Sequence, residues 1–399
     1  MCRLQVCFKN RWGVVLAAFI LVAGLAPARG LVPVAGGELY LTGEVRGVYD
    51  SNLFANRNDV DDFYLTVTPE LEFQRQTGVL HLDLRSGIVV RRHLDHSVLN
   101  AEDLYAEAEL RYPVVPGRTR TDQDLGLHYR ESTRAVENTG SRPTDEETGD
   151  VAEDWRFGAD YGIRHHLTEK TAVRSRLAGE RREFRRGRWS DRDTYSAGAD
   201  AIWIYSEKLD LFSGYRFRRT LTRRRPEGVR SVSSRDHQVS AGAEGELLPK
   251  VSGSLRAGYQ IRDFDARDRG SRDQFSFDAD TTWEATAQTQ VSLGASRDFR
   301  TSADERDVDS TSVTLTATHR LTEPYRLDAR LHYLHERFGA TATTSGRSEH
   351  TVGAESGIRY SLTERASAAL AYRVARRESD DNFFTHTRHI VDLSARMRF

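Results

Sequence analysis

The chain has 399 residues, of which 38% are hydrophobic and 29% are charged, and its formal net charge is −1. This composition excludes a bundle of membrane-spanning helices, because each such helix needs about 20 consecutive apolar residues. It does not exclude a membrane β-barrel, whose strands present only every second side chain to lipid. Since there is no basic excess, we do not expect nucleic acid as a partner.

The N-terminus has the pattern of a secretory signal. Residues Trp12–Ala26 form a short apolar run, and small residues follow it at Ala26-Pro27-Ala28. Three basic residues precede the run: Arg3, Lys9 and Arg11. A positive start, a short apolar segment and a small-residue exit define a secretory signal peptide. The sequence therefore predicts a signal peptide over residues 1–28, with an alternative cleavage site near Ala35.

The cysteines lie at the start of the chain. Both Cys2 and Cys7 precede the predicted cleavage site, so the mature protein would contain none. We therefore expect no disulfide framework and no thiolate metal site. The remaining residues, 38–399, follow one sequence rhythm, which predicts a single domain.

That rhythm is strict alternation of apolar and polar residues, the signature of strands with two different faces. In the first stretch Leu39, Leu41 and Val45 share one side, and Glu44 and Arg46 share the other. The alternation predicts about 18 strands, within a range of 16–18, because bacterial barrels have an even number. Their expected centres are near residues 44, 68, 85, 108, 127, 161, 177, 200, 215, 241, 257, 279, 295, 316, 331, 355, 371 and 393.

Short turn signals alternate with longer polar connections along the chain. The short ones lie at residues 168–170, 206–208, 248–250, 322–324 and 363–365, and the longer ones at 131–152, 222–235, 263–274 and 376–387. Short periplasmic turns and longer extracellular loops are typical of outer-membrane barrels. The predicted fold class is therefore all-β, a transmembrane antiparallel up-and-down β-barrel.

The last strand ends in an aromatic residue. Leu393, Met397 and Phe399 fall on one side of it, and Arg396 and Arg398 on the other. Alternation that ends in a terminal Phe resembles the recognition strand of outer-membrane proteins. The resemblance implies that Leu393, Met397 and Phe399 form an assembly signal read by the outer-membrane assembly machinery.

Charged residues concentrate on one side of the alternating strands. An Arg or Lys that faces lipid at the bilayer midplane costs about 2–4 kcal/mol, so the charged side should face the lumen. The predicted lumen-lining residues are Arg174, Arg176, Arg216, Arg218, Glu244, Glu246, Arg256, Arg262, Asp278, Asp280, Glu284, Asp328 and Arg330. Adjacent strands carry opposite signs, so these residues either brace the wall as cross-strand pairs or form a charge ladder that orients a polar solute.

Two predicted loops carry concentrated charge. Loop 131–152 is acidic, and it either folds inward as a constriction, binds divalent cations or stays solvated. Loop 181–192 is rich in arginine, and it either contacts lipopolysaccharide phosphates or an acidic glycan, or is a solvated loop.

The histidines do not form a recognisable metal or catalytic motif. Adjacent residues of a strand point to opposite faces, so His165 and His166 would not bind one ion, and His93 and His96 lack a known ligand spacing. Three others are expected near strand ends, facing lipid: His319, His350 and His389. We therefore expect no metal, no cofactor and no catalytic residue, and no nucleophile elbow or phosphate loop is present in the sequence.

The opening of the barrel resembles that of a known family. The segments Tyr49–Phe54 (YDSNLF), Asp61–Phe63 (DDF) and Val67–Leu71 (VTPEL) resemble the start of the putative β-barrel porin 2 family. That family includes outer-membrane proteins of exopolysaccharide operons. The resemblance implies an outer-membrane barrel with a conduit role in surface polysaccharide export, and it brings no catalytic residues. The partners it implies are outer-membrane lipid, lipopolysaccharide and polysaccharide.

Competing interpretations remain open at this point. A soluble β-sandwich also alternates, but it rarely keeps long loops on one side and short turns on the other through so many hairpins. For an outer-membrane barrel of a Gram-negative bacterium, the first functional hypothesis is a porin-like channel. The second is a plugged barrel that acts as a surface scaffold or adhesin through its loops, and the third is an outer-membrane hydrolase.

Overall fold

A computed structural model describes most of the chain from residue 32 onward. The described residues are 32–34, 36–117, 119–136, 151–185, 189–223, 232–266, 269–340 and 345–399. The predicted signal peptide and residues 137–150 of the predicted acidic loop lie outside them. The predicted signal peptide, and the predicted role of residues 137–150 as a constriction, a cation site or a solvated loop, therefore stay predictions.

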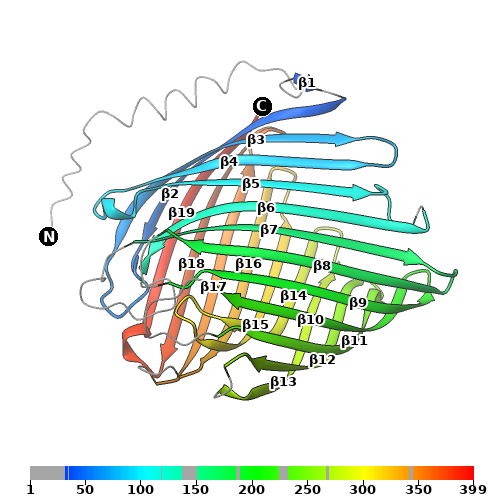
Figure 1. Ribbon diagram of the computed structural model, residues 1–399. Coiled ribbons are helices and arrows are strands. Elements are labelled where there is room, and N and C mark those ends of the chain that lie inside the picture. The colour runs from blue at the N-terminus through cyan, green and yellow to red at the C-terminus, as the bar shows by residue number, and fades with distance from the viewer. Residues whose placement is uncertain are drawn as a thin grey trace.

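One sheet closes on itself to form a barrel (Figure 1). Its strands are β2 (Gly37–Asp50), β3 (Asp62–Gln76), β4 (His81–His93), β5 (Ala101–Tyr112), β6 (Thr121–Ala135), β7 (Val151–His166), β8 (Thr171–Phe184), β9 (Arg192–Ser206), β10 (Leu209–Thr222), β11 (Ser234–Leu248), β12 (Val251–Phe264), β13 (Ser271–Trp283), β14 (Thr289–Thr301), β15 (Asp307–Arg320), β16 (Tyr325–Phe338), β17 (Arg347–Ser361), β18 (Ala366–Ser379) and β19 (His386–Arg398). Each strand pairs antiparallel with its sequence neighbours, and β19 pairs with β2 to close the ring.

The predicted fold class is confirmed, at the upper end of the expected strand number. Every predicted strand centre falls inside one of the strands β2 to β19. The sequence missed one short element, β1 (Val32–Val34), which pairs with the beginning of β2. Among the described residues, no helix has the length and apolar character needed to cross a membrane.

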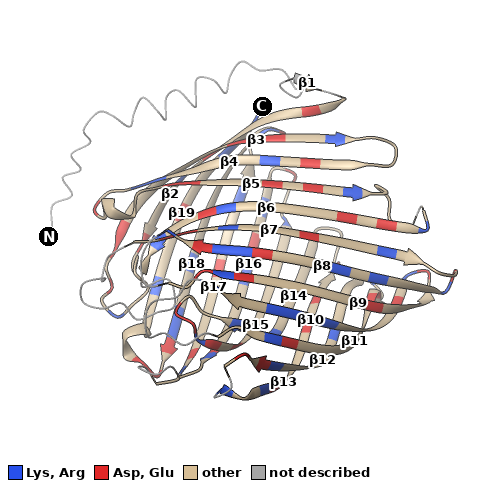
Figure 2. Cartoon of the chain, in the orientation of Figure 1, with Lys and Arg blue, Asp and Glu red and all other residues tan. Residues whose placement is uncertain are grey.

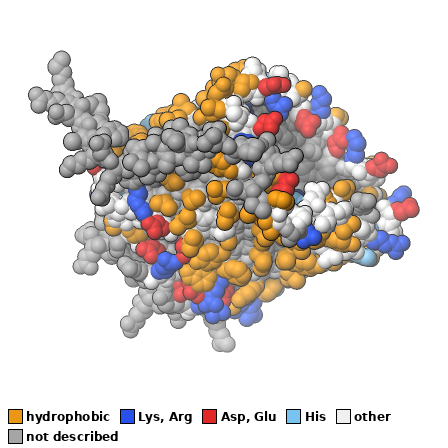
Figure 3. All heavy atoms as spheres, turned by 90° about the horizontal axis from the view of Figure 1, so that it is seen from above, with side chains coloured by type: hydrophobic (Ala, Val, Ile, Leu, Met, Phe, Trp, Pro, Cys, Tyr) orange, Lys and Arg blue, Asp and Glu red, His pale blue; other side chains and the backbone are white. Residues whose placement is uncertain are grey.

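The alternation of the sequence becomes a difference between the two faces of the wall. Large apolar side chains on alternate positions are exposed, as Leu255, Tyr259 and Phe275 show. Hydrophobic side chains cover much of the outer surface seen in Figure 3, with charged side chains mainly toward its edges. An apolar outer band of this kind suits contact with lipid hydrocarbon. Figure 2 shows that acidic and basic positions recur along the strands around the whole barrel.

The two ends of the barrel differ as the turn signals predict. Short turns join β3 to β4, β7 to β8 and β9 to β10 at one end, the right side of Figure 1. Both termini of the barrel lie at that end, where Leu41 and Phe399 exchange backbone hydrogen bonds of 3.3 and 2.8 Å. By the rule for this class the short-turn end is periplasmic, and the longer connections are extracellular.

The arginine-rich loop is shorter than predicted. Arg181 and Arg182 belong to β8 and Arg192 begins β9, so only residues 185–191 connect these strands. Likewise, residues 131–135 of the predicted acidic loop continue β6, and 151–152 begin β7. The strands extend beyond the apolar band. Because the residues there are polar, their sequence resembles that of a loop.

The two larger clusters of buried apolar residues lie at the extracellular end, and a smaller one, Ala172, Ile202 and Phe212, lies within the β8–β10 wall. One cluster consists of Val136, Ala152, Phe184, Trp189 and Ala303. A second is built from the β2–β3 and β4–β5 connections and the end of β6: Leu53, Phe54, Leu99 and Ala135. Loops therefore pack on one another over the extracellular mouth.

Candidate functional site

The charged residues meet across the inner side of the wall. Arg256 of β12 bonds to Asp200 of β9 at 2.8 Å, although β10 and β11 lie between these strands. Arg218 of β10 bonds to Asp298 of β14 at 2.6 Å, across three intervening strands. Side chains converge in this way only on the concave side of a barrel, so these residues lie on its inner face.

Asp200 is the centre of the first inner-face network. It receives Arg174 from β8 at 2.9 Å and Arg256 from β12 at 2.8 Å. Arg174 also contacts Glu244 of β11 at 2.5 Å. Both guanidinium groups lie over the ring of Phe212, at 5.2 and 4.4 Å from its centroid. One carboxylate and one aromatic ring thus hold two arginines flat against the wall.

Glycines make this arrangement possible. A Cβ at Gly214 would lie 2.0 Å from Oδ1 of Asp200, and a Cβ at Gly242 would lie 2.5 Å from the ring of Phe212. Real Cβ atoms do not approach other atoms so closely, so side chains at these positions would displace Asp200 and Phe212. The small residues between β9 and β12 are what let the long side chains lie along the wall.

The register places Arg256 opposite a carboxylate of the adjacent strand, as the sequence predicts, but Arg256 forms its ion pair with a more distant strand. Asp278 lies directly opposite Arg256 in the β12–β13 register, but Arg256 contacts Asp200 instead. The reason is that Gly242, on the other side of Arg256, leaves room for its side chain to extend toward β9. Asp278, Asp280 and Glu284 form no ion pair within the described residues.

The other predicted lumen-lining residues have different surroundings. Glu246 pairs with Lys208 in the β9–β10 turn at 2.6 Å. On the far wall, Asp328 pairs with Arg326 at 3.1 Å, and Arg330 approaches Glu355 at 3.5 Å. These pairs are partly exposed, so each adds little to stability.

A second, buried network surrounds Arg262. Its Nε and Nη2 each lie 2.7 Å from a carboxylate oxygen of Asp236. Its Nη1 lies 2.5 Å from Asp307 of β15, and its guanidinium lies 4.9 Å from the ring centroid of Phe299. The Arg262 side chain is among the largest fully buried ones in the described chain. The network joins the β11–β12 wall to the extracellular ends of β14 and β15.

The β14–β15 connection, residues 302–306, crosses the extracellular mouth. The β13–β14 pairing covers only Phe277–Trp283 with Val291–Arg297, so β14 separates from β13 above this point. Arg192 at the start of β9 donates to the carbonyl oxygens of Thr301 and Ser302 at 2.6 and 2.9 Å. Ala303 packs with Trp189 in the first apolar cluster. The polar sequence of residues 302–306 carries no signal that distinguishes it from a solvated loop.

Glu305 anchors the same segment from the inside. Its carboxylate accepts hydrogen bonds from the backbone N–H of Val232 at 2.9 Å and from the hydroxyl of Thr222 at 2.9 and 3.1 Å. Only 1% of Glu305 is exposed. Burial is the largest influence on its carboxyl and raises the pKa of Glu305 above the ordinary value, although Arg192 nearby acts in the opposite direction.

Acid should therefore hold the segment 302–306 closed. A carboxyl with a raised pKa in the closed form binds its proton more tightly there than in water. Its contribution to the closed form is complete below the ordinary Glu pKa of about 4.5 and is lost as the pH rises through the raised value. We expect thiol labelling of Ala303→Cys, measured relative to Leu94→Cys in the exposed β4–β5 connection, to increase with pH.

The control for this prediction is Glu305→Gln, which keeps the hydrogen-bonding shape and removes the titration. Its labelling ratio should not change with pH. A pH response of the same size in Glu305→Gln would assign the effect to another group.

A cavity of about 470 Å³ lies against the inner wall at mid-height. Five arginines and three aspartates line it: Arg174, Arg176, Arg216, Arg218, Arg256, Asp124, Asp160 and Asp200. Arg176 and Arg216 are exposed, although they lie on the inner face. Exposed charge on the inner face is the arrangement that a water-filled lumen requires.

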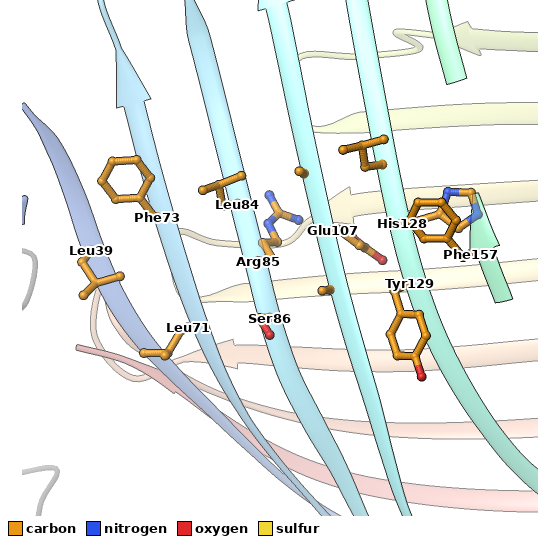
Figure 4. A pocket seen from close by; sticks show the side chains of 13 residues that line it. Leu39, Leu71, Phe73, Leu84, Arg85, Ser86, Glu107, His128, Tyr129 and Phe157 are labelled. Atoms are coloured by element: carbon orange, nitrogen blue, oxygen red, sulfur yellow. The ribbon is translucent and has the colours of Figure 1, made fainter. Parts of the chain in front are cut away.

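The hollow shown in Figure 4 is of another kind. It has a volume of about 380 Å³, and apolar side chains from successive strands surround it, among them Leu71, Phe73, Leu84 and Phe157. These residues occupy the lipid-facing positions of the alternation, and most of them are exposed. The apolar part of the hollow suits contact with lipid hydrocarbon, and Arg85 and Glu107 line its other side.

The arginines of the predicted loop 181–192 contact the protein itself. Arg182 bonds to Asp154 at 2.9 Å, and Arg185 pairs with Glu131. Asp154 also receives Arg134 and Arg156. Arg186 and Arg188 lie outside the described residues. Contact of this segment with lipopolysaccharide or an acidic glycan stays a prediction.

Histidines meet acidic or aromatic partners at the extracellular end. The ring nitrogens of His93 and His96 lie 2.9 and 3.2 Å from one oxygen of Asp62. The spacing of His93 and His96 does not predict this contact, because His96 lies in the loop after β4. Across the described parts of the chain, no group of three or more acidic, His or Cys side chains is placed to hold a metal ion.

The three histidines expected near strand ends lie beside hydroxyl groups. His319 lies 2.9 Å from the hydroxyl of Thr289, His350 lies 3.0 Å from that of Tyr333, and His389 lies 2.8 Å from that of Tyr372. Tyr333 and Tyr372 are exposed on the outer wall. Tyrosine at this level suits the membrane–water boundary.

The predicted assembly signal lies on the closing strand. Leu393 is 61% exposed on the outer wall of β19, opposite Gly47 of β2. Met397 follows on the same side, and Phe399 ends the chain beside Leu41. Recognition of these side chains by the assembly machinery stays a prediction.

The sequence comparison identifies one family. Residues 39–399 match the family described as "Putative beta-barrel porin 2". This match covers the barrel from its first strand to its last residue. No curated protein matches the chain.

Several solved structures are similar in outline. OccK1 (OpdK) of Pseudomonas aeruginosa is 12% identical, with a TM-score of 0.46, and the match covers 90% of this chain and 98% of that one. The ferric enterobactin receptor PfeA of the same organism is 8% identical, with a TM-score of 0.47 and coverage of 93% and 81%. The FrpB iron transporter of Neisseria meningitidis is 9% identical, with a TM-score of 0.46 and coverage of 85% and 62%.

Proposed function

Because the chain belongs to the "Putative beta-barrel porin 2" family of the bacterial outer membrane, we propose that it is a non-enzymatic channel for polar solutes. The observation that carries this proposal is the inner wall of β8–β12, where exposed arginines line a cavity of about 470 Å³. Eighteen strands leave an aqueous lumen unless loops obstruct it. The apolar outer wall supplies the contact with lipid.

Surface polysaccharide is our candidate for the solute. The inner face offers charges of both signs, as Arg256 and Asp200 illustrate, so it can donate and accept hydrogen bonds along a chain of hydroxyl groups. The resemblance of the Tyr49–Phe54 segment to proteins of exopolysaccharide operons also supports this candidate. Glycan, lipopolysaccharide and the assembly machinery are all proposed partners.

One observation favours a second function, a plugged barrel that acts through its surface. The extracellular mouth carries both of the larger buried apolar clusters, and residues 302–306 cross it. A permanently closed mouth would make the barrel a scaffold or adhesin. The two functions differ in whether ions pass through the barrel.

Conductance distinguishes them. We expect protein refolded without residues 1–28 to give discrete single-channel steps in planar bilayers. Insertion is checked separately by the shift in gel mobility on boiling. A barrel that shows this shift but never conducts would overturn the channel and support the scaffold.

A further inference from the structure

Two arginines of the mid-barrel cavity differ from the others that line it. Arg174, Arg218 and Arg256 are each held by carboxylates, at 2.9, 2.6 and 2.8 Å. Arg176 and Arg216 make no side-chain hydrogen bond or ion pair within the described residues. Both are exposed to the lumen. They are therefore free to bind a solute.

Their backbone positions are set by one glycine. Arg176 of β8 and Arg216 of β10 are both register partners of Gly198 in β9. Neighbouring strands are about 4.8 Å apart, so the two Cα atoms are separated by roughly 10 Å. Gly198 places no side chain between the two arginines, and a Cβ there would lie 3.8 Å from Cβ and Cγ of Arg216. That separation allows both side chains to reach a single group placed above Gly198.

The surrounding charges restrict where an anion would bind. Asp124 and Asp160 line the same cavity from β6 and β7, beyond Arg176, and repel anions on that side. On the other side, the register partner of Arg216 in β11 is the uncharged Gln238. Asp200, two residues from Gly198 in β9, also lines the cavity, but its carboxylate is already paired with Arg174 and Arg256. The favourable position is therefore between Arg176 and Arg216, over Gly198.

We propose that Arg176 and Arg216 form an oxyanion-binding site over Gly198. The group bound is a carboxylate or phosphate of a solute within the lumen, because the arginine fork matches the geometry of both. This inference deepens the proposed function and rests on it for its role: the site would retain acidic solutes, including acidic glycan units, during passage. The binding itself does not depend on conduction.

The probes are D-galacturonate and D-galactose, which share a sugar ring and differ in the carboxylate. Isothermal titration with detergent-refolded protein should show millimolar binding of galacturonate and none of galactose. Inorganic phosphate should compete with galacturonate. The double variant Arg176→Gln/Arg216→Gln should weaken galacturonate binding by at least tenfold.

Two further variants separate the site from general charge. Gly198→Leu keeps both arginines and fills the space between them, so it should also remove binding. Arg320→Gln/Arg359→Gln removes the same charge from lumen arginines of β15 and β17 that also lack ion pairs, and should leave binding unchanged. Equal losses in this control and in Arg176→Gln/Arg216→Gln would overturn the site in favour of unspecific attraction.

The site and the channel fail in different ways. Conductance without galacturonate binding would overturn the site and leave the channel intact. Binding that requires the two arginines, in a barrel that never conducts, would support the site and overturn the channel. In the conducting protein, galacturonate should block current in the wild type and not in Arg176→Gln/Arg216→Gln.

Discussion

Replacing residues 302–306 with an Asn-Gly turn should raise the single-channel conductance severalfold. Thr301 and Asp307 are register partners, so a two-residue hairpin can join β14 to β15 without changing their pairing. The replacement removes Glu305 and Ala303, which reach across the mouth to β10 and to the first apolar cluster. An 18-stranded barrel is wide enough for an aqueous path, so this obstruction should limit the current.

The matched control is the same Asn-Gly turn placed at residues 77–80, at the other end of the barrel. Gln76 and His81 are register partners there as well, and the hydrogen bond from the Val114 N–H to the Val79 carbonyl oxygen, at 3.0 Å, stays at that same end of the barrel. The control should conduct like the wild type. If the variant at 302–306 refolds, shifts on boiling and keeps the wild-type conductance, this segment is not the limiting obstruction.

The strands could be predicted from the sequence because their physical cause is local. Every second residue faces lipid, so a period of two is imposed on each strand by itself. Leu255 and Arg256 show the result: adjacent residues face opposite sides, one exposed on the outer wall and the other paired with Asp200 on the inner wall. Polar turns between the strands provided the boundaries to within a few residues.

The ion pairs could not be predicted, because they depend on contacts between strands that are not neighbours. Arg256 reaches Asp200 only because Gly214 and Gly242 leave the wall flat between them. Curvature of the closed sheet brings Arg218 to Asp298. Neither cause is visible within the sequence of one strand.

The inward position of the β14–β15 connection, residues 302–306, could not be predicted for a related reason. Extending the alternation from Leu293 would place Phe299 toward lipid. In the structure only 1% of Phe299 is exposed, and it packs against Arg262 and Arg272. The end of β14 leaves its partner β13 and turns inward, and the polar sequence of residues 302–306 looks like any solvated loop. Trp189, an aromatic residue in a short connection, was the one sequence signal of packing there.

The largest loss of stability is expected for Arg262→Met. The Met side chain fills part of the volume of the Arg262 side chain. It leaves the buried carboxylates of Asp236 and Asp307 without the Arg262 guanidinium. Removing one partner of a buried ion pair costs about 3–5 kcal/mol, because the remaining charge stays out of water. Arg218 and Arg272 still contact these carboxylates, so the lower part of that range is expected. Urea unfolding in lipid vesicles measures the change in the free energy of unfolding.

The comparison variant is Arg326→Met, whose guanidinium is exposed and contacts Asp328 at 3.1 Å. An exposed pair contributes about 1 kcal/mol or less, so Arg326→Met should remain close to the wild type. Equal losses would mean that burial does not set the cost. Since Arg262 also packs on Phe299, its loss should loosen the end of β14 and raise the conductance, as replacement of residues 302–306 does. If Arg262→Met lowers the free energy of unfolding but leaves the conductance unchanged, the Arg262 network stabilises the barrel wall without holding residues 302–306 in place.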